Sequence, residues 1–180
     1  RSSATAHVEG NCGATFPSEW VWLQAASSEA SLLAAGGNFK IVGPFGFPGY
    51  TWLLVYQSPR VRCDFRSNEI LSSKIISQDI GPATLVLVLE KSVSRREKLR
   101  FELRASAPPD SFFSDRLYVP TRDGFSNDPG TAQSFQGDVQ IKVVSMVRGC
   151  DETVLDDTAF SVAAIEFGGD LLRTEILQNL

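Results

Sequence analysis

Two tryptophans and a glutamine occupy alternate positions within "EGNCGATFPSEWVWLQA" at 9–25. Because side chains two residues apart share one face of a β-strand, we expect Trp20, Trp22 and Gln24 to point to the same side. Two indole rings beside an amide could bind a flat apolar ligand and cap it with one polar contact. Stacked tryptophans could equally close one end of a barrel core, and both interpretations stay open at this point.

Glu9 and Asn11 lie just before this segment and are candidates for acid–base chemistry. A carboxyl group that is kept away from water beside indole rings stays protonated, because burial disfavours its charged form. Such a group could donate a proton to an apolar substrate in a dry pocket. Asn11 could orient either the carboxyl group or the substrate.

A second aromatic group lies in "FGFPGYTW" at 45–52, which places Phe45, Phe47, Tyr50 and Trp52 among glycines and a proline. This composition is typical of a loop. Aromatic side chains in a loop are costly to leave in water, so we expect a barrel mouth, a membrane contact or a protein interface there.

The sequence also contains two charged clusters, for which a functional role has less support. The acidic residues of "CDETVLDD" at 150–157 lack the spacing of a calcium-binding loop, and a solvated hairpin tip is the favoured interpretation. The basic segment "SRREKLR" at 94–100 could contact lipid headgroups or an acidic protein, but a solvated turn is favoured there too.

Composition excludes several classes of function. The formal net charge of −4 gives no basic field that would draw the chain to nucleic acid. His7 is the only histidine, and the three cysteines show no CxxC spacing, so we expect neither a histidine-based triad nor a metal site. The longest apolar run, "TLVLVL" at 84–89, has the length of a strand and is too short to span a membrane as a helix.

The elements that must position these residues follow a period of two. The segments 61–66, 98–104 and 138–144 alternate apolar and polar residues, which predicts strands with one buried and one wet face. Further strands are expected at 19–26, 30–35, 38–43, 51–57, 84–90 and 158–167, with turns at clusters of glycine and proline that include Gly36-Gly37. The stretch 105–135 is rich in loop formers, and 170–180 is the one candidate for a short helix.

These observations predict an all-β fold, an antiparallel lipocalin-like barrel of about eight strands that forms a single domain over 1–180. Closing the sheet removes exposed strand edges. At this size the interior holds side chains or one small ligand. The residues predicted to be buried are Trp20, Trp22, Leu99, Phe101, Leu103, Val139 and Ile141.

The segment "HVEGNCGATFPSEWVWLQAA" at 7–26 resembles the opening of the second half of plant and cyanobacterial tocopherol cyclases. The family's Glu-Lys-Asn-Trp-Gly motif corresponds to 9–13, its Phe-Pro to 16–17, and its Trp-x-Trp-x-Gln strand to 20–24. The segments "GTAQSFQGDVQIKVV" and "DTAFSVAAIEFGGDLL" resemble the family's closing blocks. The similarity therefore runs in register over most of the 180 residues.

The resemblance implies a lipocalin-like barrel from a two-barrel protein that binds prenylated quinols at plastid membranes. Tocopherol cyclases close a chromanol ring after an acid protonates the prenyl double bond. By this resemblance Glu9 would be the acid, Asn11 its partner, and Trp20 and Trp22 the walls that stabilise the cation. Glu166 holds the matching Ala-Ala-x-Glu position, with a solvated outer residue as an equal alternative.

Two departures change the expected function. Gly10 stands where the family has a basic residue and Cys12 where it has a tryptophan, and the family's first barrel would precede this segment. We therefore expect a non-catalytic domain that binds a hydrophobic ligand or serves as an accessory subunit of a thylakoid membrane assembly in the chloroplast. A prenylquinone, carotenoid or chlorophyll is the candidate ligand, no cofactor is required, and contact with a thylakoid or plastoglobule membrane would be peripheral. The alternative is a tocopherol cyclase.

Overall fold

The computed structural model of the protein describes residues 17–39, 49–66, 69, 71–115, 119–121, 124–126 and 130–173. Strands account for most of these residues, and two short 3-10 helices, η1 and η2, accompany them. The elements are β1 (Glu19–Ala26), β2 (Ser31–Phe39), β3 (Gly49–Gln57), β4 (Arg62–Phe65), β5 (Ser73–Gly81), β6 (Thr84–Ser92), β7 (Glu97–Ser106), η1 (Pro109–Ser111), β8 (Phe113–Asp115), β9 (Val119–Thr121), β10 (Gly124–Ser126), β11 (Thr131–Val147), β12 (Thr153–Gly169) and η2 (Asp170–Arg173).

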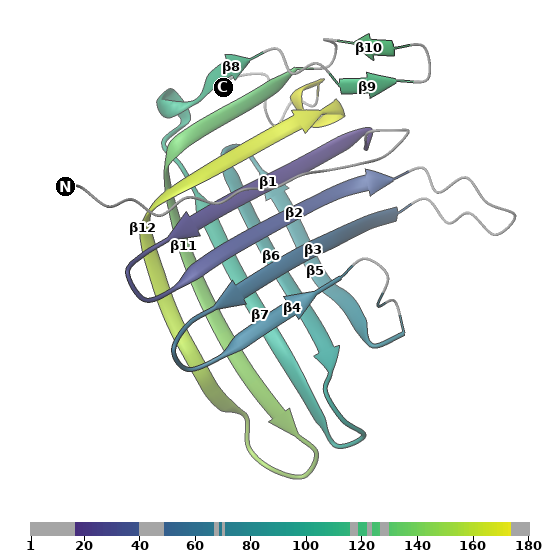
Figure 1. The fold of residues 1–180 in the computed structure, drawn as a ribbon, viewed down its shortest axis with the longest axis vertical. Helices are drawn as coiled ribbons and strands as arrows, with labels where there is room; N and C mark the ends of the chain where they lie inside the picture. The colour runs from purple at the N-terminus through teal and green to yellow at the C-terminus, as the bar shows by residue number, and fades with distance from the viewer. Residues whose placement is uncertain are drawn as a thin grey trace, which may run out of the picture.

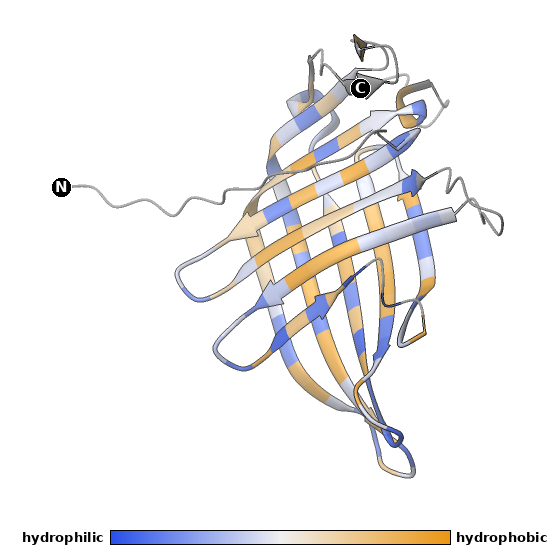
Figure 2. Cartoon of the chain, turned by 45° about the vertical axis from the view of Figure 1, so that its right-hand side comes forward, coloured by the Kyte–Doolittle hydropathy of each residue, from blue (hydrophilic) through white to orange (hydrophobic). Residues whose placement is uncertain are grey.

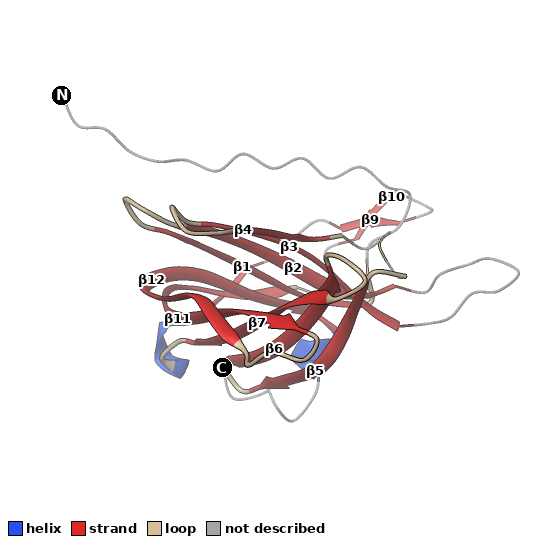
Figure 3. Ribbon diagram, turned by 90° about the horizontal axis from the view of Figure 1, so that it is seen from below, coloured by secondary structure: helices blue, strands red, loops and turns tan. Residues whose placement is uncertain are grey.

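Nine strands form a nearly closed antiparallel barrel in the order β4-β3-β2-β1-β12-β11-β7-β6-β5 (Figure 1). Seen from below, β2, β3 and β4 form one layer and β5, β6 and β7 the other, with β11 and β12 joining the two layers at one side (Figure 3). Short β8 pairs with the start of β11, and β9 pairs only with β10. The predicted all-β antiparallel barrel is confirmed.

The barrel remains open at one place, between β4 and β5, which end the strand order and form no ladder with each other. We call this line the seam. The strand β5 was not predicted, because "SKIISQDIG" does not alternate and most of its side chains are exposed. A β-bulge between Ile75 and Ser77 further breaks its period.

Strand β2 corrects a predicted turn. It runs unbroken through Gly36-Gly37, and residues 40–43 of the second predicted strand lie outside the described residues. A Cβ atom on Gly36 would lie 2.5 Å from ring atoms of Trp52, which faces it from β3. Glycine is needed at this position because an indole ring lies against the strand.

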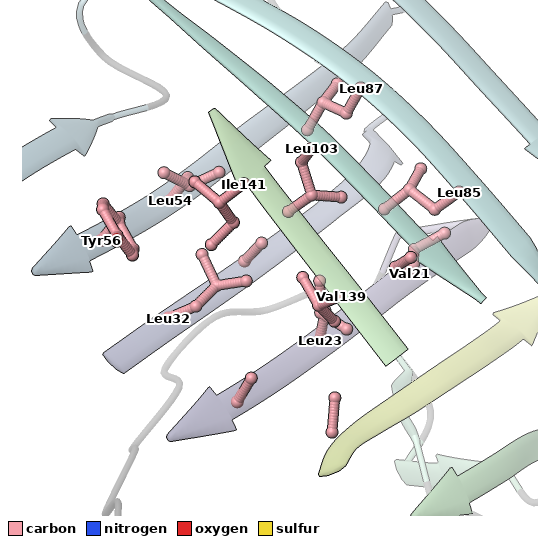
Figure 4. Close-up of a cluster of buried hydrophobic side chains, with 14 of the residues drawn as sticks. Val21, Leu23, Leu32, Leu54, Tyr56, Leu85, Leu87, Leu103, Val139 and Ile141 are labelled. Carbon is pink, nitrogen blue, oxygen red and sulfur yellow. The ribbon is translucent and has the colours of Figure 1, made fainter. Parts of the chain in front are cut away.

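The interior is filled by buried side chains from every strand of the barrel except β5, whose half-buried Ile80 packs against the core. Figure 2 shows the alternation of apolar and polar residues along the strands, and Figure 4 shows leucines, valines and Tyr56 meeting inside. Phe101, Leu103, Val139 and Ile141 are exposed by 1% or less, as predicted, and half-buried Leu99 packs against them. Burial of each such side chain stabilises the fold by about 1.5–3 kcal/mol.

The connections carry only short structure. In the predicted loop-rich stretch 105–135, the described residues between β7 and β11 contribute η1 and three strands of three residues each, as expected, whereas 131–135 already belong to the long strand β11. The C-terminal helix is the single 3-10 turn η2, and 174–180 lie outside the described residues. Among the residues described, no helix has the length and apolar character to cross a membrane.

Candidate functional site

Trp20, Trp22 and Gln24 lie on the outer face of β1, so the prediction that they point into the barrel is wrong. Val21 and Leu23, which alternate with them, belong to the core and are exposed by only 1% and 0%. The alternation could not choose between the faces, because both sets of side chains on this strand are largely apolar.

Trp20 is nevertheless buried, because its ring lies against Gly168 of the neighbouring strand β12. Its Nε1 donates a hydrogen bond of 2.5 Å to Oε1 of Glu166, and Oε2 of Glu166 accepts one of 2.9 Å from Nε2 of Gln133. Glu166 therefore faces outward, as one of the two interpretations held, but it is half-buried and bonded. These contacts tie β1, β12 and β11 together on the outer surface.

Four predicted site residues, Glu9, Asn11, Phe45 and Phe47, lie outside the described residues. The roles assigned to them stay predictions.

Tyr50 and Trp52 lie on β3, not in a contact loop, and they face the barrel interior. Trp52 is only 4% exposed, and the two rings stack with their centroids 6.0 Å apart and 28° between their planes. Trp52 is therefore not the exposed aromatic contact that was expected, whereas Tyr50 is half-buried and its role as a contact stays a prediction. Glycine and proline suggested a loop, but the strand begins at Gly49 and places these side chains two residues apart on one face.

A cleft of about 230 Å³ lies beside Tyr50 and Trp52, at the seam. It forms because β4 pairs only with Leu54–Gln57, the second half of β3, and leaves the first half without a neighbour on that side among the described residues. We call it the seam cleft. Its lining residues are Tyr50, Thr51, Trp52, Phe65, Arg66, Ser73, Lys74, Ile75 and Leu89.

Side chains hold the two edges of the seam together where no backbone ladder does. Nε1 of Trp52 donates a hydrogen bond of 2.7 Å to Oε1 of Gln78 on β5. Nζ of Lys91 lies 2.8 Å from a carboxylate oxygen of Glu69 and donates to the backbone oxygen of Asp64 at 2.9 Å. Sequence reasoning missed Gln78 because its strand was not predicted.

The hydroxyl group of Tyr50 is the most informative atom of the seam cleft. It is buried, and no described residue gives it a hydrogen-bond partner. A buried polar group without a partner costs about 1–3 kcal/mol, so such a group needs an explanation. Burial, with a smaller contribution from the Glu19 carboxylate, raises the pKa of this phenol above its usual value. The hydroxyl is therefore neutral and able to donate or accept a hydrogen bond.

The other end of β3 carries a polar cluster around Asp156, which is 4% exposed. The hydroxyl of Tyr56 donates to Oδ2 of Asp156 at 2.9 Å, and Ser58 donates to the same oxygen. Oδ1 accepts hydrogen bonds from the Asp157 amide at 3.0 Å and from the Thr158 hydroxyl at 3.3 Å. The predicted solvated hairpin tip is therefore wrong for Asp156.

The electrostatics of this cluster indicate a structural role. Burial alone would raise the pKa of Asp156, but hydrogen bonds from Ser58, Tyr56, the Asp157 amide and Thr158 together hold the pKa below its usual value. Burial, followed by the Asp64 charge, raises the pKa of the neighbouring Cys63 thiol to about 11. A bonded carboxylate and an inert thiol stabilise a fold and leave no group poised to react.

Metal binding finds no support in the described part of the chain, where no three histidine, cysteine, aspartate or glutamate side chains lie close enough to hold an ion.

Comparison with models of known protein families, with curated proteins and with solved structures finds no match to this chain. The resemblance to tocopherol cyclases therefore stays a hypothesis that rests on the sequence motifs.

Proposed function

We propose that this protein is a non-catalytic barrel that binds a hydrophobic, ring-bearing small molecule in the seam cleft. The observation that carries the proposal is the buried hydroxyl of Tyr50, which has no partner among the described residues and lines a cleft with aromatic walls. A ligand with an oxygen atom near this hydroxyl would give it a hydrogen-bond partner, and an apolar ring of the same ligand would pack against Trp52.

The size of the cleft limits how the ligand lies. Pockets for drug-sized molecules measure about 300–1,000 Å³, and the seam cleft, with about 230 Å³, is smaller. A ligand could bind inside the barrel only if it displaced the packed core. Disrupting the core would cost more free energy than ligand binding supplies. The cleft therefore suits one end of a ligand, such as a quinol ring, with a longer chain lying outside it.

The setting of the cleft favours binding over catalysis. Ring closure through a carbocation needs a pocket without water. Arg66 and Lys74 at the cleft have side chains that are 62% and 61% exposed, so water reaches its rim. Gly10 and Cys12 also depart from the cyclase motif.

The resemblance to tocopherol cyclases favours a chloroplast setting at thylakoid or plastoglobule membranes. It makes a prenylquinone, a carotenoid or a chlorophyll the candidate ligand, and an accessory subunit of a membrane protein assembly the role. A tocopherol cyclase is the second candidate, because Glu9 and Asn11 keep the acid and amide of that motif.

The test is a titration of the purified chain with a prenylated hydroquinone, followed by calorimetry. We expect Trp52→Leu to weaken binding about tenfold or more, because each lost aromatic contact costs on the order of 1 kcal/mol beyond its area. Trp22→Leu is the matched control, since it removes an indole from the outer face of β1. Equal losses in the two variants would contradict binding in the seam cleft.

The same samples test for catalysis. We expect no chromanol by chromatography after prolonged incubation. Chromanol that forms in the unmodified chain and is absent in Glu9→Gln would overturn the non-catalytic proposal and make Glu9 the acid.

A further inference from the structure

The seam cleft continues into a second recess at the start of β5. This recess measures about 250 Å³ and shares Ser73 and Lys74 with the seam cleft. We call it the lysine recess. Its lining residues are Leu71, Ser72, Ser73, Lys74, Glu90, Ser92 and Lys98. An aromatic hollow and a polar hollow thus meet at two common residues.

The lysine recess has an excess of positive charge. Glu90, whose side chain is 11% exposed, has Nζ of Lys74 at 3.6 Å, Nζ of Lys98 at 3.7 Å and Nε of Arg100 at 3.4 Å. Arg100 also binds the exposed carboxylate of Glu152 at 3.1 Å. Three cations therefore share two carboxylates, in a chain whose net charge is −4.

The two lysines keep hydrogen-bonding capacity for another group. Their distances to Glu90 exceed the 2.7–3.2 Å of a good N–H to O hydrogen bond, and their side chains are 61% and 50% exposed. An ammonium group has three donors. Lys74 and Lys98 can therefore turn donors toward an anion in the recess while Arg100 continues to balance Glu90.

We infer that the joined cleft and recess bind an amphiphile with an anionic headgroup. The headgroup, a phosphate, sulfate or carboxylate, lies between Lys74 and Lys98, and the apolar part lies against Trp52, Phe65 and Leu89. This inference rests on the proposed function and deepens it, because the seam cleft alone would accept a neutral ring and the lysine recess selects the charged molecule.

The experiment compares decyl phosphate, decanol and inorganic phosphate by calorimetry with the purified chain. We expect decyl phosphate to bind about tenfold more tightly than decanol, and inorganic phosphate to bind more weakly than either. The double variant Lys74→Gln/Lys98→Gln should reduce the affinity for decyl phosphate to the affinity that the same variant shows for decanol. High salt should weaken the binding of decyl phosphate and of inorganic phosphate, and it should not weaken the binding of decanol.

The matched control is Arg104→Gln/Arg148→Gln, which removes the same charge from exposed positions outside the recess. It should leave the preference for decyl phosphate intact. Equal affinities of the unmodified chain for decyl phosphate and decanol would overturn the anionic headgroup and leave the proposed function standing. Failure of both amphiphiles to bind, when the prenylated hydroquinone binds, would overturn this inference alone, and failure of all three ligands would overturn the proposed function as well. Inorganic phosphate binding as tightly as decyl phosphate would overturn the amphiphile in favour of a free anion.

Discussion

Tyr50 and Tyr56 lie six residues apart on β3 and face the same interior, but their hydroxyl groups have opposite surroundings. The hydroxyl of Tyr56 lies 2.9 Å from a carboxylate oxygen of Asp156 and 3.0 Å from the Thr158 hydroxyl. The buried hydroxyl of Tyr50 has no partner among the described residues. Tyr56 thus belongs to a complete hydrogen-bond network at one end of β3, whereas Tyr50 lines the open seam cleft at the other end.

The two ends of β3 also differ in their pairing with β4. Beside Tyr56 the ladder to β4 is formed, with Cys63 as the opposite residue. Beside Tyr50 that ladder has ended, and the Trp52 side chain crosses the seam to Gln78. One end of β3 is therefore stabilised by a complete hydrogen-bond network, whereas the other end has an unused polar group, and a ligand would gain most from binding there.

The largest expected effect is at the closed end. Asp156→Ala removes the common acceptor of Tyr56, Ser58 and Thr158, of which Tyr56 is fully buried and the other two are half-buried. We expect the free energy of unfolding to fall by about 3 kcal/mol, measured by urea denaturation. Asp157→Ala, at the exposed neighbour, is the control and should change stability by about 0.5 kcal/mol or less. Similar losses in the two variants would contradict a structural role for Asp156.

The pH dependence of stability should sharpen the same comparison. Because folding holds the pKa of Asp156 below its unfolded value, this carboxylate stabilises the fold above the unfolded pKa, near 4. The stabilisation is lost as the pH falls through the folded pKa. We therefore expect the stability difference between the unmodified chain and Asp156→Asn to be constant from pH 7 to 5 and to shrink below about pH 4. A difference that widens in acid would mean that the pKa is raised.

The fold was predictable wherever one face of a strand is wet and the other is buried. The segments 61–66, 98–104 and 138–144 alternate strictly and became β4, β7 and the centre of β11. Alternation was uninformative where the two faces of a strand do not differ in polarity: β1 is apolar on both sides, and β5 borders the seam with most side chains exposed. Alternation reports burial, and it carries no signal where burial is similar on both faces.

The candidate site was predictable only in part. Tyr50 and Trp52 stood out by residue type, but the cleft beside them exists because β4 is short, which no local pattern records. Asp156 could not be separated from the neighbouring acidic residues, because the predicted strand began at 158, whereas β12 begins at Thr153 and places Asp156 in register with Thr158 and Phe160. Bulges and strand ends are set by the whole sheet, so residues that depend on them need the structure.

The last and smallest expected effect is a difference in stability between the variants Tyr56→Phe and Tyr50→Phe. Tyr56→Phe removes a donor from a buried carboxylate and should lower the free energy of unfolding by about 1.5 kcal/mol. Tyr50→Phe removes a hydroxyl that has no partner among the described residues, so it should raise the free energy of unfolding by up to about 1 kcal/mol. The same variant should weaken the binding of a prenylated hydroquinone, because the ligand loses its polar contact. Urea denaturation of both variants measures the change in the free energy of unfolding, and calorimetry measures the change in ligand affinity. If Tyr50→Phe destabilises the chain as much as Tyr56→Phe, the hydroxyl of Tyr50 is already satisfied without a ligand, and the contrast between the two ends of β3 disappears.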